Sequence, residues 1–166
     1  QGNRVGTLLF HYIVAQLKAK CNMPKNPLLV RSRVTGHMVD AIAKKQGVTV
    51  KEVLTGFRYI GEIVDETSRS GEQSFLFGFE ESFGYLRGSR VRDKDAILAA
   101  MLLVECALYH NEKGLSLLQA LDGLYEAYGY YLETVPNYSL EGIEGQAKIA
   151  AAMATLRTAA PADLSG

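Results

Sequence analysis

Apolar side chains recur along this chain with two different periods. Spacings of three and four residues predict amphipathic helices, whereas short aromatic or β-branched runs bounded by Gly and Pro predict strands. We therefore expect an alternation of helices and strands. The helices are predicted at 3–20, 36–47, 56–69, 93–110, 116–129 and around 149–156, and the strands at 28–34, 48–54, 74–79 and 130–136.

Local signals mark where several of these elements begin and end. Asn3 is expected to cap the first helix, and Gly47 is a natural stop for the second. Ser116 and Gln119 have the spacing of a capping box. The apolar run over residues 96–108 is expected to form a buried helix.

The segment SFLFGF, residues 74–79, reads as a strand covered on both faces. Simple alternation puts Phe75, Phe77 and Phe79 on one face and Leu76 on the other. Strands that alternate with helices favour a parallel sheet between helical layers. The predicted fold is therefore α/β, a layered α/β/α domain with a mixed, largely parallel sheet of about four strands.

The amino-acid composition limits the kinds of molecule that the chain is expected to bind. The 166 residues include 18 Lys and Arg against 18 Asp and Glu, so no overall charge favours nucleic acid or an anionic membrane surface. The longest apolar run is too short for a membrane span. Cys21 and Cys106 lie far apart without metal-like spacing, which favours buried thiols in a reducing compartment, and hence a cytoplasmic location.

Three polar turns follow predicted strands, at residues 33–38, 54–61 and 79–95. Loops that leave the carboxyl ends of parallel strands meet at one edge of the sheet, where α/β folds bind ligands. We expect all three turns to line one rim. The third turn carries the densest chemistry, with adjacent carboxylates, a serine and several cations.

If strand geometry continues beyond residue 79, Glu80 and Ser82 point to the same face and Glu81 to the other. A carboxylate and a hydroxyl two positions apart suit a vicinal diol of a sugar. The alternative is that Glu80 or Glu81 pairs with a nearby arginine while Ser82 caps a turn.

The start of the predicted helix after this turn could hold an anion. Arg92 and Lys94 lie where backbone N–H groups attract a phosphate, although both could equally be solvated surface charges. Asp93 and Asp95 have no third ligand nearby in sequence, so no metal site is expected.

Three ordered motifs give the chain a specific resemblance. TGFRYIGE (55–62), GFEESFGYLRG (78–88) and VRDKDA (91–96) resemble the third domain of the α-D-phosphohexomutase family, the phosphoglucomutases and phosphomannomutases. They are most similar to the branch that includes phosphopentomutase-like enzymes. The resemblance implies a sugar-recognition domain over residues 1–136, and a C-terminal helix and linker over 137–166 that lead toward a fourth domain.

The resemblance also assigns roles to residues. It implies that Glu80 and Ser82 bind sugar hydroxyls and that the segment from Thr55 to Phe57 lies against the sugar. Arg58 stands where many members carry lysine. With the anion-binding argument for Arg92, the expected substrate-binding residues are Glu80, Ser82, Thr55, Gly56, Phe57, Lys94, Arg92 and Arg58.

In the family, hexose 1-phosphate and 6-phosphate are interconverted through a phosphoserine and a bisphosphate intermediate. The resemblance thus implies a hexose or pentose phosphate substrate, Mg²⁺ bound by another domain, glucose 1,6-bisphosphate as activator, and the remaining domains of the same chain as partners. No cofactor is expected in this chain. The family's serine loop and magnesium loop do not occur in the sequence, so the chain alone is expected to be inactive. The alternative is a non-catalytic sugar-phosphate-binding or interaction module.

Overall fold

The structure is a computed structural model that describes residues 1–134 and 138–159. The chain divides into two units, residues 1–132 and 133–166, and each is described by itself. The described part of the second unit contains the helix α6 (Gly142–Thr158). The first unit contains, in order, α1 (Gly2–Ala19), β1 (Pro27–Ser32), α2 (Met38–Gln46), β2 (Thr49–Val53), α3 (Phe57–Ser70), β3 (Ser74–Phe79), β4 (Tyr85–Leu86), α4 (Ala96–Asn111) and α5 (Leu117–Tyr128).

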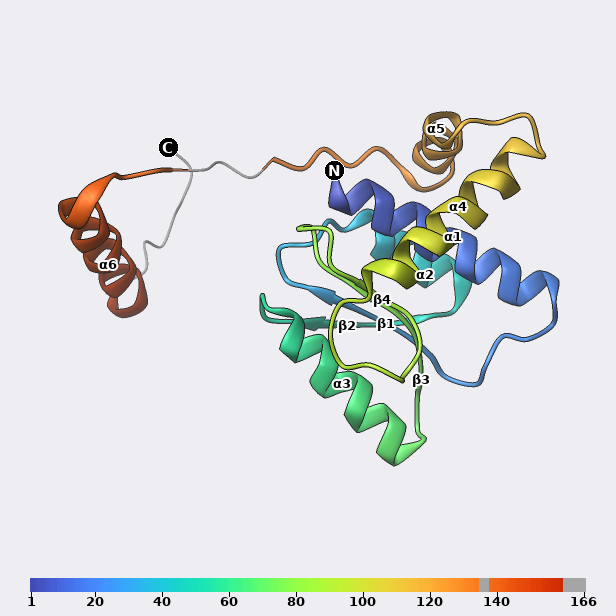
Figure 1. The fold of residues 1–166 in the computed structure, drawn as a ribbon, viewed down its shortest axis with the longest axis horizontal. Helices are drawn as coiled ribbons and strands as arrows, with labels where there is room; N and C mark the ends of the chain where they lie inside the picture. The colour runs from blue at the N-terminus through green and yellow to red at the C-terminus, as the bar shows by residue number, and fades with distance from the viewer. Residues whose placement is uncertain (135–137, 160–166) are drawn as a thin grey trace. The chain divides into compact units, whose positions relative to one another are not determined.

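The strands form one sheet in the order β2-β1-β3-β4 (Figure 1). β1 pairs in parallel with β2 and β3, and only β4 is antiparallel. The α/β fold with a mixed, largely parallel sheet of four strands is therefore confirmed. The sequence did not predict β4, because a two-residue strand is too short to show a period.

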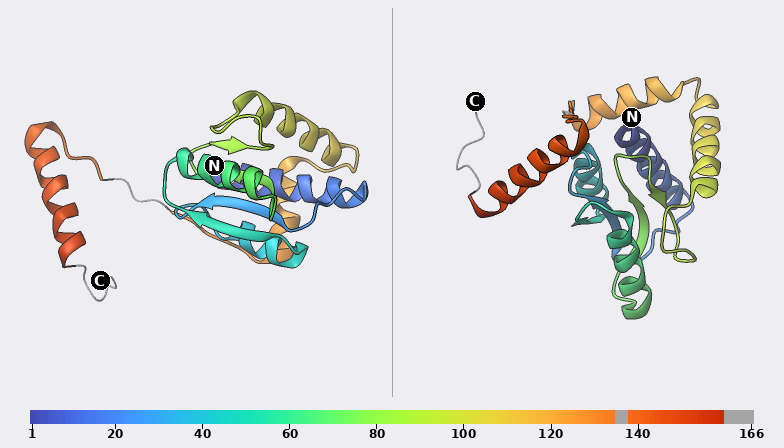
Figure 2. Two further views of the ribbon diagram at one scale, coloured as in Figure 1. Left: turned by 90° about the horizontal axis from the view of Figure 1, so that it is seen from below. Right: turned by 60° about the vertical axis from the view of Figure 1, so that its left-hand side comes forward.

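Helices cover both faces of the sheet (Figure 2). Leu29, Phe77 and Phe79 pack with α1 and α2 on one face. Leu28 and Val30 pack against α3 on the other, as expected for a strand buried on both sides. In the right-hand view of Figure 2, α1 lies between α2 and α4, and it contacts both helices.

β3 contains an irregularity that changes which side chains share a face. Leu28 is paired with Phe75 and Leu29 with Phe77, so Leu76 is an extra residue in β3. Such a bulge changes which face of the sheet the side chains before it point to, relative to the side chains after it. Phe75 therefore packs with Leu28, Val30 and the residues of α3, whereas Phe77 and Phe79 pack with α1. The prediction that all three phenylalanines lie on one face is wrong for Phe75, and the prediction that Leu76 lies on the other face is wrong too, because Leu76 packs in the same cluster as Phe77 and Phe79.

α4 is less buried than its sequence suggested. Leu102, Cys106 and His110 are buried on one side, but Ile97 and Val104 are exposed. Because α4 contacts α1, α5 and β4 from one side only, its uniformly apolar sequence still leaves a solvent-facing surface. The expectation of a buried helix is wrong for this surface.

Several boundaries follow the predicted signals and others do not. The capping box of Ser116 and Gln119 is present, and Gly47 ends α2 in the left-handed conformation. Gln1, not Asn3, occupies the N-cap of α1. The strand candidate at 130–136 is wrong over 130–134, which form no strand, and its last two residues lie outside the described part.

The structure also tests what the sequence suggested about the cysteines and about membrane spans. Both cysteines are free, but Cys21 is exposed, so the expectation of two buried thiols holds only for Cys106. Burial raises the pKa of Cys106 to about 11. Among the described residues, no helix has the length and apolarity needed to cross a membrane.

A buried arginine holds together the first two strands and α2. Arg31, near the end of β1, is only 4% exposed, and it forms ion pairs with Asp40 at 2.6 Å and Glu52 at 3.1 Å. Its contact with Asp40 is bidentate, through Nε and Nη2. His37 lies 3.1 Å from the same guanidinium. The loop between β1 and α2 is thus fixed to the sheet.

The charges in this network stabilise each other. Burial alone would raise the pKa of Asp40, but hydrogen bonds from Arg31 and His37 outweigh burial and hold the pKa below its ordinary value. The carboxylate therefore contributes stability that is present above pH 3.8, its ordinary pKa, and is lost as the pH falls through the lowered folded value.

We expect Arg31→Leu to lower the free energy of unfolding at pH 7 by about 1–3 kcal/mol, because it removes a buried hydrogen-bond partner from carboxylates that stay partly solvated. Urea unfolding measures this loss. Arg33→Leu is the matched control, since Arg33 is 71% exposed and shares Glu52; a much smaller change is expected. The difference between Arg31→Leu and the unmodified chain should shrink in acid. Equal losses for the two variants would contradict the assignment.

Candidate functional site

The carboxyl ends of the three parallel strands bring their loops together, as the sequence predicted. The backbone N–H of Gly56, after β2, donates to Oε1 of Glu80, after β3, at 2.8 Å. The hydroxyl of Ser32, at the end of β1, donates to Oε2 of Glu81 at 3.2 Å. The loop after β3 is therefore hydrogen-bonded both to the loop after β2 and to the end of β1, and we call this edge the strand-end rim.

Glu80 is the most enclosed carboxylate of the rim. It is 6% exposed, and its own N–H donates to the carbonyl of Gly84, which closes the loop after β3. No described residue donates to its second oxygen, Oε2. Glu80 is thus held in place through one oxygen while the other keeps its capacity to accept hydrogen bonds.

The residue that donates to Glu80 has a backbone conformation that favours glycine. Gly56 has a φ of 121°, a conformation that residues with a Cβ rarely adopt, and it occupies the N-cap of α3. This conformation directs its N–H to Glu80. The sequence TGF at residues 55–57 therefore acts through its backbone as well as its side chains.

Strand alternation does not relate Glu80 to Ser82 as predicted. β3 ends at Phe79, and the loop then turns through Phe83, whose φ of 64° is left-handed. As a result Glu80 is buried, whereas Ser82 is exposed. The expectation that strand geometry continues to Ser82 is wrong, and any joint role of the two must come from the loop.

Lys94 and Phe57 lie on either side of the same loop. Lys94 Nζ is 5.1 Å from the centroid of the Phe57 ring, and both side chains pack against Gly84, where an added Cβ would lie within about 3 Å of each. Lys94 also pairs with Asp93 at 2.9 Å, and this hydrogen bond lowers the pKa of Asp93. A cation therefore stands beside Gly84, the residue that closes the Glu80 loop.

The remaining predicted residues lie further out. Thr55 is exposed and precedes Gly56. Arg58 stacks on Tyr59, with its guanidinium carbon 4.6 Å from the ring centroid, and bonds the Tyr59 hydroxyl at 2.6 Å. Arg92 packs on Gly61 of α3 and lies 3.5 Å from Asp65. Neither arginine is hydrogen-bonded to Glu80.

Other residues of the rim were not singled out in the sequence. Ser32 and Thr35 are buried and their hydroxyl oxygens are 2.7 Å apart, so they form a polar floor that continues to Glu81. Phe83 is 64% exposed at the tip of the loop. The turn that contains Thr35 was predicted to line the rim, but nothing in the sequence distinguished its buried hydroxyls from solvated ones.

The N-terminal turn of α1 also reaches the rim. A Cβ on Gly2 would lie 1.9 Å from the carbonyl oxygen of Glu81, so only glycine fits there. The carbonyl of Gly2 accepts a hydrogen bond from the Tyr85 hydroxyl at 3.0 Å. Burial raises the pKa of Tyr85 to about 12, so this donor stays protonated at neutral pH.

The rim therefore offers a carboxylate oxygen, exposed hydroxyls and one cation around a fixed backbone. This set can hydrogen-bond polyols and attract a single anionic group. Among the described residues, no group of three or more His, Cys, Asp or Glu side chains is arranged to hold a metal ion.

Curated relatives extend along nearly the whole chain. A phosphoglucomutase from Staphylococcus aureus strain bovine RF122 is 33% identical over 165 residues, and one from Staphylococcus epidermidis strain RP62A is 34% identical over 165 residues. Each alignment includes 99% of this chain but 29% of the relative. The chain thus spans less than a third of the length of these enzymes.

Solved structures share the fold. A protein of Thermus thermophilus named as a phosphomannomutase matches 76% of this chain and 25% of its own, with a TM-score of 0.58 and 21% identity. The open form of pp63/parafusin, a phosphoglucomutase from Paramecium, matches 78% of this chain and 21% of its own, with a TM-score of 0.54 and 22% identity.

The family model that matches residues 1–128 is described as phosphoglucomutase/phosphomannomutase, alpha/beta/alpha domain III. This range includes all four strands and helices α1 to α5, and therefore the complete strand-end rim. The chain belongs to the phosphoglucomutase/phosphomannomutase family, of which it carries domain III.

Proposed function

We propose that this chain is the sugar-recognition domain of a phosphosugar mutase, and that Glu80 and Ser82 bind hydroxyls of the substrate. The single observation that carries the proposal is the Gly56–Glu80 hydrogen bond at the strand-end rim, within a domain of this family. It holds a buried carboxylate at the strand-end rim, and no residue in the described part of the chain donates to the second oxygen of that carboxylate.

The unpaired oxygen gives Glu80 a specific task. A sugar hydroxyl that donates to Oε2 replaces water at a carboxylate already oriented by Gly56, so little entropy is lost on binding. The exposed Ser82 hydroxyl can accept from, or donate to, a neighbouring hydroxyl. Both groups recognise hydroxyls without regard to which end of the sugar carries phosphate.

Contacts that do not depend on the orientation of the sugar suit the proposed reaction. The parent enzyme would interconvert hexose 1-phosphate and 6-phosphate through a phosphoserine and a bisphosphate intermediate that reorients between two transfers. A pentose phosphate is equally compatible with the diol contacts. Mg²⁺ would neutralise charge during transfer and would be held, like the serine, by other domains; glucose 1,6-bisphosphate would act as activator.

The cations have separate proposed roles. Lys94 would exchange Asp93 for a substrate phosphate or hydroxyl, because its ammonium lies at the rim and is exposed. Arg92 and Arg58 would contribute charge from the α3 side of the rim, and Thr55, Gly56 and Phe57 would contact the sugar. We place the enzyme in the cytoplasm, where sugar phosphates are metabolised.

A second candidate is a sugar-phosphate-binding or interaction module without catalysis. The sequence upstream of residue 1 in the parent gene distinguishes the two, since a mutase must supply the serine and the metal-binding aspartates there. A parent that lacks both would contradict the mutase.

In the parent protein we expect Glu80→Ala to lower kcat/KM about ten- to a hundredfold, as removal of a charged hydrogen-bond partner costs roughly 1.5–3 kcal/mol. Glu80→Gln should show a similar loss in kcat/KM yet keep the stability of the unmodified protein, because an amide oxygen still accepts from Gly56. Steady-state assays and urea unfolding measure both effects.

Glu81→Gln is the matched control, since it makes the same charge change one residue away on a carboxylate bound to Ser32. It should retain kcat/KM within a few-fold. Unmodified efficiency in a folded Glu80→Gln variant would show that Glu80 serves only to hold the loop.

The isolated chain should bind glucose 1-phosphate with a Kd weaker than about 100 µM, because most phosphate contacts would belong to other domains. It should show no mutase activity. Titration calorimetry tests the first expectation, and submicromolar affinity would mean that this domain alone holds the phosphate.

A further inference from the structure

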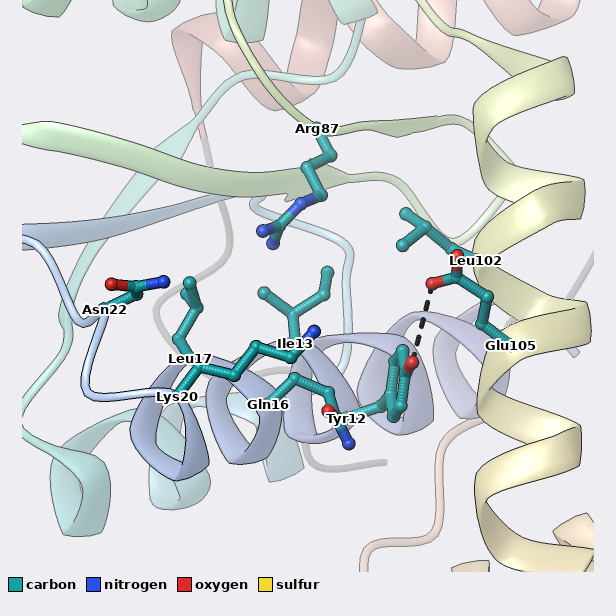
Figure 3. Close-up of a pocket in the computed structure, with 9 residues that line it drawn as sticks. All are labelled: Tyr12, Ile13, Gln16, Leu17, Lys20, Asn22, Arg87, Leu102 and Glu105. Carbon is teal, nitrogen blue, oxygen red and sulfur yellow. Dashed lines mark hydrogen bonds between the residues drawn. The ribbon is translucent and has the colours of Figure 1, made fainter.

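A polar pocket lies toward the opposite end of the strands from the strand-end rim. It has a volume of about 160 Å³ and lies between the second half of α1, the segment after β4, and α4 (Figure 3). Because β4 is antiparallel to β3, Arg87 emerges near the start of β3 rather than its end. A second hollow that Arg87 also lines includes Ser74 and Phe75, the first residues of β3.

The pocket contains a cation without a partner. Nη1 of Arg87 is buried and has no hydrogen-bond acceptor in the described part of the chain. Figure 3 shows its guanidinium pointing from the β4 side toward α1. Burial lowers the pKa of Arg87, although the negative charge of Glu105 opposes this effect. An arginine stays protonated even so, and a buried N–H donor without an acceptor is unfavourable in a folded protein, although the Arg87 side chain as a whole is half-buried.

The surroundings of Arg87 are suited to an oxyanion. Lys20 lines the same pocket and, in the described part of the chain, forms no ion pair. Figure 3 shows its side chain running back along α1 toward Ile13. Asn22 adds an amide donor and Leu17 supplies an apolar wall, whereas Figure 3 shows the Gln16 amide directed away from Arg87.

Two features oppose an anion, and neither removes the positive charge of the pocket. Glu105 lines the pocket and keeps its negative charge, since its Oε2 accepts only from the neutral Tyr12 hydroxyl at 3.4 Å, but it makes no ion pair with Arg87. The C-terminal carbonyls of α1 point toward this end, but Gln16, Leu17 and Lys18 accept from the N–H groups of the residues that follow the helix. The net charge of the lining side chains is positive.

We propose that this pocket binds the oxyanion group of a small phosphorylated or carboxylated metabolite, with Arg87 as the principal contact and Lys20 as the second cation. The oxyanion supplies the acceptor that Nη1 lacks, and arginine pairs bidentately with either group. The site is separate from the strand-end rim, so its ligand can bind at the same time as a sugar.

The test is an NMR titration of the 166-residue chain in phosphate-free buffer at low salt, which follows the Arg87 side-chain Nε–H resonance. Inorganic phosphate and acetate are separate arms that distinguish the two oxyanions, and glucose is the uncharged control. We expect a saturable shift with phosphate, acetate or both, with a Kd on the order of 1 mM, and none with glucose.

Backbone resonances around Tyr12 to Asn22 follow the same binding in variants that lack Arg87. Arg87→Gln should raise the Kd for the oxyanion at least tenfold, and Lys20→Gln, a change on the surface, should raise it a few-fold. Arg90→Gln is the matched control for charge, because Arg90 is exposed in the same segment. Lys94→Gln should leave binding unchanged, which separates this site from the proposed sugar site.

Absence of a saturable shift with both oxyanions would overturn the proposal. So would affinity that is equal in Arg87→Gln and Arg90→Gln. If Arg87→Gln does not fold, Lys20→Gln decides alone, and unchanged affinity in that variant overturns the proposal.

Discussion

The hydrogen bond from the Gly56 N–H to Glu80 is the constraint on which the strand-end rim depends. β2 and β3 are not neighbours in the sheet, since β1 lies between them. A bond between their loops therefore spans the end of β1 and covers its last residue, Ser32. Once covered, the Ser32 hydroxyl needs partners inside the protein, and Thr35 and Glu81 provide them. Beneath this layer Arg31 connects β1 to α2 and β2 in the same way.

The two ends of the strands differ in how their buried charges are satisfied. At the strand-end rim, Arg31 has two carboxylate partners and Glu80 has a backbone donor. Toward the opposite end, Nη1 of Arg87 has none among the described residues. A fully paired network fixes geometry, whereas a buried donor without an acceptor leaves a hydrogen bond that the proposed oxyanion would supply. The first arrangement suits a site that must present its groups in fixed positions, and the second suits a site whose ligand completes it.

Much of the fold could be predicted because its signals are local. The capping box at Ser116 and the stop at Gly47 act within a few residues and are confirmed, and the alternation of periods gave the correct elements up to residue 128 apart from β4. It failed at residues 130–134, which form no strand. The errors arose where tertiary structure decides. The bulge at Leu76 depends on pairing with β1, and the exposure of α4 depends on how many elements surround it. β4 exists only because its two residues pair with the end of β3.

The candidate site, like the fold, has features that the sequence identifies and features that only the tertiary structure decides. Sequence could identify the three loops that meet at the rim, but not that Glu80 would be buried and Ser82 exposed, because the turn after Phe79 depends on Gly84 and Phe83. The network of Arg31 also escaped notice, since its carboxylates come from different elements. The bulge at Leu76 separates two parts of β3 that pair with β1 in different phase. Loss of this one extra residue would join the two parts into a regular ladder and leave the pairing of Phe77 and Phe79 with β1 unchanged. The strand end that carries Glu80 therefore tolerates a change of one residue in length at the start of the strand.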